Sequence, residues 1–278
     1  MQSKMKHHKT LRSLYVAALI SLVSFTAQAD QLADVKKSGE LVIGTEMQFA
    51  PFDYLDKGQQ QGFNPALFQL IGEQMGVKVR FMDLPWSGVL PGLEAGKFDL
   101  VGGPLIVTQA RKDRYSYTLP IAEATVALMV RAKDDSISKP EDIAGKVVGA
   151  GKGSAMLEEL RAYSATLSKP VTIREYVDNN QAYSDLSAGR IAAVANSLPN
   201  ISYIASQRSE VFKVVQPPFG KPSYFAYVGR KGDESKALIN EINQALIKLH
   251  TDGRLAALQT RWLGAEMQVP TTDVVPSW

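Results

Sequence analysis

The chain has 278 residues, of which 31 are Lys or Arg and 28 are Asp or Glu, so its formal net charge is +3. Four basic residues and no acidic one lie within residues 1–29, which leaves 27 basic against 28 acidic residues in the rest of the chain. A nearly neutral remainder argues against nucleic-acid binding driven by overall charge. The absence of cysteine excludes a thiol nucleophile, a disulfide framework, a cysteine zinc site and a lipid-anchored cysteine.

Residues 1–29 have the pattern of a cleavable secretory signal peptide. Basic residues up to Arg12 precede an apolar run over 14–25, and Ala27–Ala29 supplies small residues before a cleavage site at Asp30. A retained membrane anchor is the alternative, but the run is shorter than the roughly 20 apolar residues that span a bilayer. We therefore expect a periplasmic protein, secreted by this signal peptide and carrying no lipid anchor.

The rest of the chain alternates short apolar runs with amphipathic segments. Strands are predicted at 41–44, 77–82, 98–102, 126–130, 146–149, 171–177, 191–195, 211–215 and 224–228. Helices are predicted at 64–76, 87–95, 155–162 and 233–252, the first of them capped by Asn64 with proline at the next position. This alternation is typical of an α/β fold with mostly parallel sheets flanked by helices, and the length suits two lobes.

One segment of the chain echoes another that lies 93 residues later. Residues 93–101 and 186–194 share Leu, Ala, Gly and Val at matched positions, with Lys/Arg and Phe/Ile as similar pairs. Each copy has the pattern of a helix end, a glycine cap and a buried strand. The echo therefore favours two lobes that are wound in the same way.

Several motifs, in this order, resemble those of family 3 periplasmic solute-binding proteins, the amino-acid-binding components of ABC importers. They are Leu41–Thr45, Phe49–Phe52, Gly62–Asn64, Pro85–Leu93, Gly96–Asp99, Thr108–Arg111, Ile143–Gly149, Gly153–Ser154, Gly189–Arg190, Asp252–Leu255 and Arg261–Gly264. The resemblance covers nearly the whole chain after the signal peptide. It implies the two-lobed, type II periplasmic-binding-protein fold, with two hinge crossovers and a ligand held between the lobes.

By this resemblance, lobe 1 is discontinuous and comprises residues 30–125 and 226–278, whereas lobe 2 comprises residues 126–225. The two crossovers are expected near 126–131 and 224–229.

The resemblance also implies a carboxylate site built around Arg111. This residue matches the family arginine that binds the ligand's α-carboxylate, and a guanidinium holds a carboxylate through two parallel hydrogen bonds. Thr108 matches a position that assists the same carboxylate. From the sequence alone, the charged run 111–114 is equally typical of solvated surface. Ser154 precedes the predicted helix 155–162, whose first N–H groups offer an anion site, and it is also an ordinary N-cap residue.

Three further residues match positions around the ligand's side chain. Phe49 and Trp86 match two aromatic positions that sandwich it, since ring faces bury apolar carbons and attract cations. We expect Phe52, by contrast, to pack in the core. Glu46 stands where some family members place an acid that faces a basic side chain, although a solvated carboxylate at a strand end is an equal alternative.

The sequence departs from the family where the ligand's α-ammonium is usually held. Pro104 and Ile106 occupy the positions of a glycine and a hydroxyl residue, and Ser197, next to Asn196, replaces the usual acid. An ammonium left without a carboxylate in an apolar cleft costs on the order of several kcal/mol. We therefore expect a small carboxylate whose amine is absent, modified or held differently, with Glu46, Asn196 or Asp185 as alternative partners.

These features predict a non-enzymatic receptor that captures an amino acid, a derivative or an organic acid and delivers it to an ABC permease in the inner membrane. We expect a monomer without a cofactor, metal or nucleic-acid partner. Two alternatives remain: an enzyme on the same fold, dehydratase- or lyase-like, with Glu46 or Glu94 as the acid, and a sensor that feeds a signalling receptor. His250 is the only histidine after residue 29 and is expected to be exposed.

Overall fold

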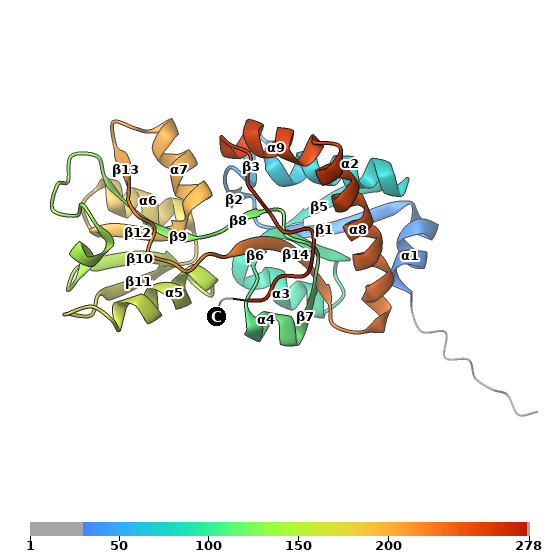
Figure 1. Ribbon diagram of the computed structural model, residues 1–278, viewed down its shortest axis with the longest axis horizontal. Coiled ribbons are helices and arrows are strands. Elements are labelled where there is room, and N and C mark those ends of the chain that lie inside the picture. Colours follow the sequence, from blue (N-terminus) through green and yellow to red (C-terminus); the bar gives the residue numbers. More distant parts are fainter. Residues whose placement is uncertain (1–29, 277–278) are drawn as a thin grey trace, which may run out of the picture.

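The structure, a computed structural model, describes residues 30–276. The predicted signal peptide, residues 1–29, lies outside the described residues. Figure 1 shows two α/β lobes side by side, with extended segments passing between them near the middle of the molecule. Within the part of the chain that the structure describes, no helix is long and apolar enough to cross a bilayer.

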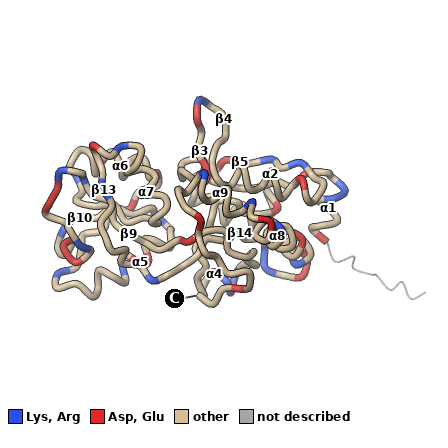
Figure 2. Tube along the Cα trace, turned by 45° about the horizontal axis from the view of Figure 1, so that its top comes forward, with Lys and Arg blue, Asp and Glu red and all other residues tan. Residues whose placement is uncertain are grey.

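Lobe 1 is built on a six-stranded sheet in the order β5-β1-β6-β14-β7, with β8 also paired to β14. The strands β5, β1 and β6 are parallel, whereas β14 runs antiparallel to its neighbours. The strands are β1 (Glu40–Thr45), β5 (Lys78–Asp83), β6 (Leu100–Ile106), β7 (Tyr115–Tyr117), β8 (Ala122–Glu123) and β14 (Tyr224–Arg230). A small separate sheet holds β2 (Gln48–Phe49), β3 (Asp53–Asp56) and β4 (Gln59–Gln61), and its β3–β4 hairpin projects from the body in Figure 2.

Six helices belong to lobe 1. They are α1 (Gln31–Ser38), α2 (Phe63–Met75), α3 (Trp86–Glu94), α4 (Gln109–Arg114), α8 (Asp233–Thr251) and α9 (Arg254–Leu263). The helices α1, α2, α8 and α9 pack against one another, while α3 packs on β1, β6 and β14. The fully buried side chains of Phe68 and Tyr227 stack within this core, with ring centroids 4.4 Å apart.

Lobe 2 repeats the arrangement with a five-stranded sheet in the order β11-β10-β12-β9-β13. Here too three strands are parallel, and β9 and β13 are antiparallel to their neighbours. The strands are β9 (Val126–Arg131), β10 (Val147–Gly151), β11 (Thr172–Tyr176), β12 (Ala193–Ser197) and β13 (Phe212–Val215). The helices are α5 (Ala155–Ser164), α6 (Asn179–Ser187), α7 (Leu198–Gln207) and the 3₁₀ turn η1 (Pro140–Ile143). Both sheets are therefore mixed, and the three parallel strands lie together on one side of each sheet.

The chain passes between the two sheets twice. It leaves lobe 1 after β8 and enters lobe 2 at β9, and it returns through residues 216–223 to β14. The two connections run side by side, because the N–H of Ala124 donates to the carbonyl of Ser223 (2.8 Å). Tyr224 and Phe225 already pair with β8 in lobe 1, so the predicted boundary after residue 225 falls inside β14.

The predicted elements and the sequence echo are confirmed. Each predicted strand and helix falls on an observed one. The two copies of the echo form α3–Gly96–β6 in lobe 1 and α6–Gly189–β12 in lobe 2, and both glycines have a positive φ, of 69° and 74°. The matched glycines therefore reverse the chain in the same way before the central strand of each sheet.

The predicted N-cap of α2 is wrong. The helix is preceded by Gly62 rather than by Asn64, and Gly62 has a φ of 130° and so little room that a Cβ atom would lie 2.2 Å from the carbonyl oxygen of Phe52. Asn64 lies inside the first turn and is fully buried. Its amide donates to the Asp53 carboxyl and accepts a hydrogen bond from the Tyr227 hydroxyl (2.8 Å). Asn64 thereby satisfies two buried polar groups that water does not reach, instead of capping the helix.

Candidate functional site

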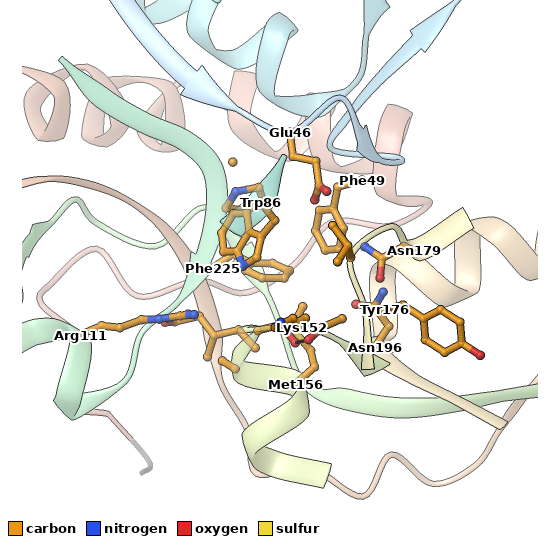
Figure 3. A pocket seen from close by; sticks show the side chains of 17 residues that line it. Glu46, Phe49, Trp86, Arg111, Lys152, Met156, Tyr176, Asn179, Asn196 and Phe225 are labelled. Carbon is orange, nitrogen blue, oxygen red and sulfur yellow. Dashed lines mark hydrogen bonds between the residues drawn. The ribbon is translucent and has the colours of Figure 1, made fainter. Parts of the chain in front are cut away.

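A pocket lies between the lobes and is lined by both of them (Figure 3). Its wall comprises Glu46, Phe49, Trp86, Gly103, Pro104, Ile106, Arg111 and Phe225 from lobe 1, and Gly151, Lys152, Ser154, Ala155, Met156, Tyr176, Val177, Asn179 and Asn196 from lobe 2. Apolar and aromatic walls with a few convergent polar groups are typical of a small-molecule site.

Arg111 supplies the main positive charge of the lobe 1 wall. It lies on α4, and its guanidinium donates to the carbonyl of Ile106 (3.3 Å), which also accepts from the Tyr117 hydroxyl (2.9 Å). Burial lowers the pKa of Arg111, although neighbouring tyrosines oppose this. No ion pair of Arg111 is found within residues 30–276. A partly buried guanidinium without an ion pair to a carboxylate is therefore available to an anionic ligand.

The N-terminus of α5 lies on the lobe 2 wall. Ser154 caps this helix: its Oγ accepts from the N–H of Leu157 (3.1 Å) and donates to the carbonyl of Gly151 (2.7 Å). Ala155 and Met156 form the start of the helix and line the pocket, and the first N–H groups of a helix have no partner within it. This end therefore adds a second attraction for an anion, from the lobe opposite Arg111.

Aromatic rings form the lobe 1 side of the pocket. Phe49 packs face to face with Phe52 (5.6 Å between centroids) and edge-on to Phe225 (6.0 Å). Phe52 is fully buried and lies outside the pocket wall, which confirms its predicted place in the core. Trp86 begins α3 and also lines the pocket. The rings offer apolar faces to the carbon skeleton of a ligand.

Glu46 is the only carboxylate among the residues that line this pocket. It follows β1 directly, and Figure 3 shows its side chain entering the pocket from the side away from Arg111. Burial raises the pKa of Glu46 to about 7, and the nearby carboxylates of Asp178 and Asp83 also raise it. A hydrogen bond from the backbone N–H of Trp86 acts in the opposite direction and lowers the pKa. This buried carboxyl gains most from a cation, which would stabilise its charged form.

The residues at the expected ammonium site offer no charge. Pro104 and Ile106 line the pocket with apolar side chains, and Asn196 lines it with a polar but uncharged amide. Ser197 and Thr108 are buried but do not line the pocket, so their direct ligand contacts stay a prediction. Thr108 instead caps α4, because its Oγ1 accepts from the N–H of Arg111 (3.3 Å).

Several lining residues were not predicted. Phe225 lies on β14, where its sequence context is that of a core strand. Lys152, Met156, Tyr176 and Asn179 surround the loop-to-helix junctions of lobe 2. The sequence signal that points to them is their position at the carboxyl ends of β10 and β11, where α/β sheets place their ligands. No group of three or more His, Asp or Glu residues suited to a metal ion occurs in the described part of the chain.

Residues 41–265 match the family model of bacterial extracellular solute-binding proteins, family 3. The chain belongs to this family. The matched range coincides with the range over which the motifs were recognised, so this solute-binding protein has the predicted two-lobed fold and a receptor's role.

Individual relatives share most of the chain. The solute-binding protein is 28% identical to the L-cystine-binding protein TcyJ of Escherichia coli strain K12, over 93% of this chain and 96% of that protein. It is 31% identical to a solved ancestral arginine-binding protein bound to glutamine, with a TM-score of 0.73, over 81% of this chain and 98% of that one. An ancestral amino acid-binding protein, AncCDT-1, described as a precursor of cyclohexadienyl dehydratase, is 29% identical with a TM-score of 0.75, over 84% and 100% of the two chains.

Proposed function

We propose that this solute-binding protein captures an amino acid in the pocket between its lobes and delivers it to the permease of an ABC importer. The observation that carries this proposal is the partly buried Arg111 side chain, which lines the pocket and has no ion pair with an acidic residue among the described residues. The names of the relatives support the same ligand class, since they include a cystine-binding protein and an arginine-binding protein.

The ligand's carboxylate binds between Arg111 and the N-terminus of α5 in this proposal. The two groups belong to different lobes, so a carboxylate that contacts both stabilises the closed arrangement. Phe49 and Trp86 enclose the carbon skeleton of the ligand.

A cationic group of the ligand binds at Glu46 rather than at the usual family position of the α-ammonium. Two observations support this placement: Glu46 is the only carboxylate of the wall, and the residues at the usual position are Pro104, Ile106 and the neutral Asn196. An ammonium at Glu46 restores the charge that burial disfavours there. Because Glu46 and Arg111 enter the pocket from different sides, this cationic group belongs to the ligand's side chain, and the proposed ligand is an amino acid with a cation at the end away from its carboxylate.

A thermal-shift panel tests both parts of this proposal. At a hundredfold excess over Kd, a true ligand stabilises the folded protein by about 2.7 kcal/mol, which a melting curve resolves. We expect shifts with one or a few L-amino acids that carry a cation in the side chain, and none with analogues that lack that cation. Shifts with the analogues alone would move the cation away from Glu46, and no shift with any compound would contradict the amino-acid proposal.

We also propose that the protein releases its ligand unchanged. Glu94, one of the two acids considered for catalysis, lies outside the pocket and accepts hydrogen bonds from Arg114 (2.7 Å) and Tyr115 (2.5 Å). His250 is exposed on α8, likewise away from the pocket. Glu46 then stands without a second carboxyl or a histidine in the pocket wall. Mass analysis of a captured amino acid after prolonged incubation tests this: recovery of the intact ligand is expected, and an eliminated or dehydrated product would support the enzyme alternative.

A further inference from the structure

A chain of buried polar side chains runs from the pocket to the opposite lobe. Asn196 lines the pocket, and its amide donates to the Tyr183 hydroxyl (3.1 Å). That hydroxyl donates to Oδ1 of Asn200 (2.6 Å), and the Asn200 amide donates to the carbonyl of Ala50 in lobe 1. All three side chains are at least 95% buried, with exposed fractions of 3%, 5% and 1%.

The direction of each hydrogen bond in this chain is fixed. A tyrosine hydroxyl has one proton to donate, and Tyr183 gives it to Asn200 while it accepts from Asn196. Oδ1 of Asn196 accepts from the N–H of Ser197 (2.8 Å), which holds the amide in one orientation. The amide of Asn200 must then point its nitrogen at lobe 1. Because every side chain in this row of hydrogen bonds is neutral, the hydrogen bonds do not depend on pH in the neutral range.

Both ends of the chain lie at the ligand site. Asn196 lines the pocket from lobe 2, and Ala50 directly follows Phe49, which lines it from lobe 1. A second contact lies beside this crossing: with its amide turned to face the carboxylate, Gln48 donates to Asp178 (2.7 Å). Figure 1 shows where this occurs, at the side of lobe 2 where α6 and α7 face the lobe 1 segment that holds β2 and β3. The lobes are therefore joined behind the pocket by side chains as well as by the two connections of the main chain.

We propose that Tyr183 and Asn200 are positioning residues that form a latch, which stabilises the closed arrangement of the lobes and thereby raises the affinity for the ligand. This inference deepens the proposed function, because it assigns a control of closure to residues that do not line the pocket. The bond from Asn200 to Ala50 exists only while the lobes are together, whereas the bonds within lobe 2 persist in any arrangement. A ligand favours the same closed arrangement, so removal of the latch lowers the population that binds it.

The variants Tyr183→Phe and Asn200→Ala test the latch. The first removes the central hydroxyl. The second removes the bond between the lobes together with the acceptor of the Tyr183 hydroxyl, and leaves Tyr183 paired with Asn196. The matched control is Tyr227→Phe, which deletes an equally buried hydroxyl that also donates to an asparagine (Asn64, 2.8 Å) but within lobe 1 alone. All three variants lose stability, so stability alone does not distinguish them.

The distinguishing readout is the lobe arrangement. The chain has no cysteine, so dyes are attached specifically at Lys97→Cys in lobe 1 and Gln207→Cys in lobe 2, both of which are exposed. In ligand-free protein we expect Tyr183→Phe and Asn200→Ala to change the dye-to-dye distance and to raise the radius of gyration in small-angle X-ray scattering, and Tyr227→Phe to leave both unchanged. With L-arginine and L-cystine as probes, the affinity of the two latch variants falls about tenfold, which is about 1.4 kcal/mol.

Two results overturn the latch. One is an unchanged lobe arrangement in both latch variants, and the other is an equal change in the Tyr227→Phe control. The ligand-free measurement needs no bound amino acid, so the latch is decided even if neither probe binds. Failure of both probes with an altered lobe arrangement would leave the latch standing and count against the amino-acid proposal.

Discussion

The two lobes follow the same strand order, β5-β1-β6-β14 in lobe 1 and β11-β10-β12-β9 in lobe 2. The antiparallel strand of each lobe ends in an arginine that donates to the main chain of the echoed segment: Arg230 to the carbonyl of Phe98 (3.2 Å) and Arg131 to that of Ile191 (3.1 Å). Phe98 and Ile191 are matched positions of the echo. The shared sequence pattern thus gives both lobes the same backbone frame, including one partly buried contact of an arginine side chain.

The lobes differ where a helix follows the central strand. In lobe 1, Thr108 precedes α4 and Arg111 lies three residues later, in the pocket wall. In lobe 2, Ser197 precedes α7 and Asn200 lies three residues later, bonded to the other lobe. One junction therefore carries the charge for the ligand, and the other carries a neutral contact between lobes. Figure 2 shows acidic and basic residues interspersed over both lobes, so the division of roles is local.

The largest effect is expected at the junction in lobe 1. Arg111→Ala removes the guanidinium that the proposed carboxylate needs, and loss of one partner of a desolvated charge pair costs about 2–5 kcal/mol, roughly thirtyfold or more in affinity. Arg114→Ala is the matched control, because Arg114 lies on the same helix but is exposed and paired with Glu94. Isothermal titration calorimetry with the amino acid found in the panel measures both variants. Equal losses in the two variants would remove Arg111 from the site.

The lobes are next expected to respond in opposite directions to pH. In lobe 1, burial raises the pKa of Asp53 from 3.8 to about 8, whereas in lobe 2 hydrogen bonds from Ser136 lower the pKa of Asp134. The folded state therefore binds a proton at Asp53 that the unfolded state has lost, and stability falls by about 1.4 kcal/mol per pH unit between roughly pH 4 and 8. Asp134 acts the other way, because its stabilisation is lost as the pH falls below about 4.

Urea unfolding at pH 6, 7 and 8 separates the two carboxyls. Asp53→Asn keeps an oxygen acceptor for Asn64 and is expected to reduce the fall in stability over this range, leaving below about pH 7 only the part that the raised pKa of Glu46 contributes. Asp134→Asn in lobe 2 shifts the free energy of unfolding by a constant amount and leaves the slope unchanged. A slope between pH 7 and 8 that is as steep in Asp53→Asn as in the wild type would place the raised pKa elsewhere.

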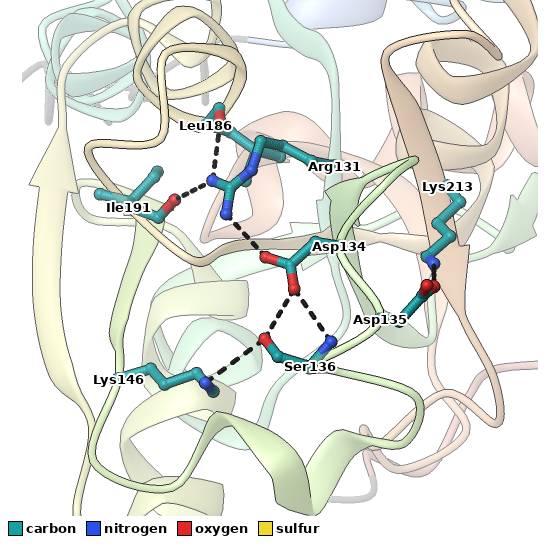
Figure 4. Close-up of polar contacts among 8 residues, drawn as sticks. All are labelled: Arg131, Asp134, Asp135, Ser136, Lys146, Leu186, Ile191 and Lys213. Carbon is teal, nitrogen blue, oxygen red and sulfur yellow. Dashed lines mark hydrogen bonds and ion pairs between the residues drawn. The ribbon is translucent and has the colours of Figure 1, made fainter.

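The third prediction concerns the two arginines of the shared frame. Arg131 donates to the carbonyls of Leu186 (3.2 Å) and Ile191 (3.1 Å) and pairs with Asp134 (2.6 Å), as Figure 4 shows. Arg230 has one such bond, to Phe98. Arg131→Met, which keeps the apolar stem, is therefore expected to cost about 2 kcal/mol and Arg230→Met about 1 kcal/mol. Hydrogen exchange measures where each loss falls, and increased exchange confined to the lobe that carries the substitution is expected.

The sequence predicted the frame well because local patterns determine it. The helix–glycine–strand copies around Gly96 and Gly189 follow from residues that are close in sequence. Arg111 and Trp86 were expected at the site from the resemblance to the family, and both line the pocket. The hairpin β2–β4 was not predicted, since its short strands over residues 48–61 are polar and lack the alternation of a half-buried sheet.

The latch and the cap of α2 show what sequence patterns miss. Asn200 bonds to Ala50, 150 residues away, and nothing in the sequence around either residue indicates the other. Asn64 has the pattern of an N-cap, but the buried Asp53 and Tyr227 take both ends of its amide. In each case an asparagine is placed by a distant buried group and not by its local preference.

The smallest effect is expected at Glu46 of lobe 1, whose pKa is raised by burial and further by the charge of Asp178 in lobe 2. With a pKa of about 7, the ionised fraction of Glu46 rises from about 0.1 at pH 6 to about 0.9 at pH 8, so the affinity for an ammonium ligand is expected to rise roughly ninefold. Glu46→Gln removes this dependence, whereas Asp53→Asn, which does not line the pocket, preserves it. Calorimetry at both pH values measures the ratio, and a wild-type affinity that does not change with pH would contradict pairing at Glu46. Asp178 of lobe 2 also raises the pKa of Glu46, so Asp178→Asn is expected to move the midpoint of this rise to lower pH, because closure brings the two carboxylates together.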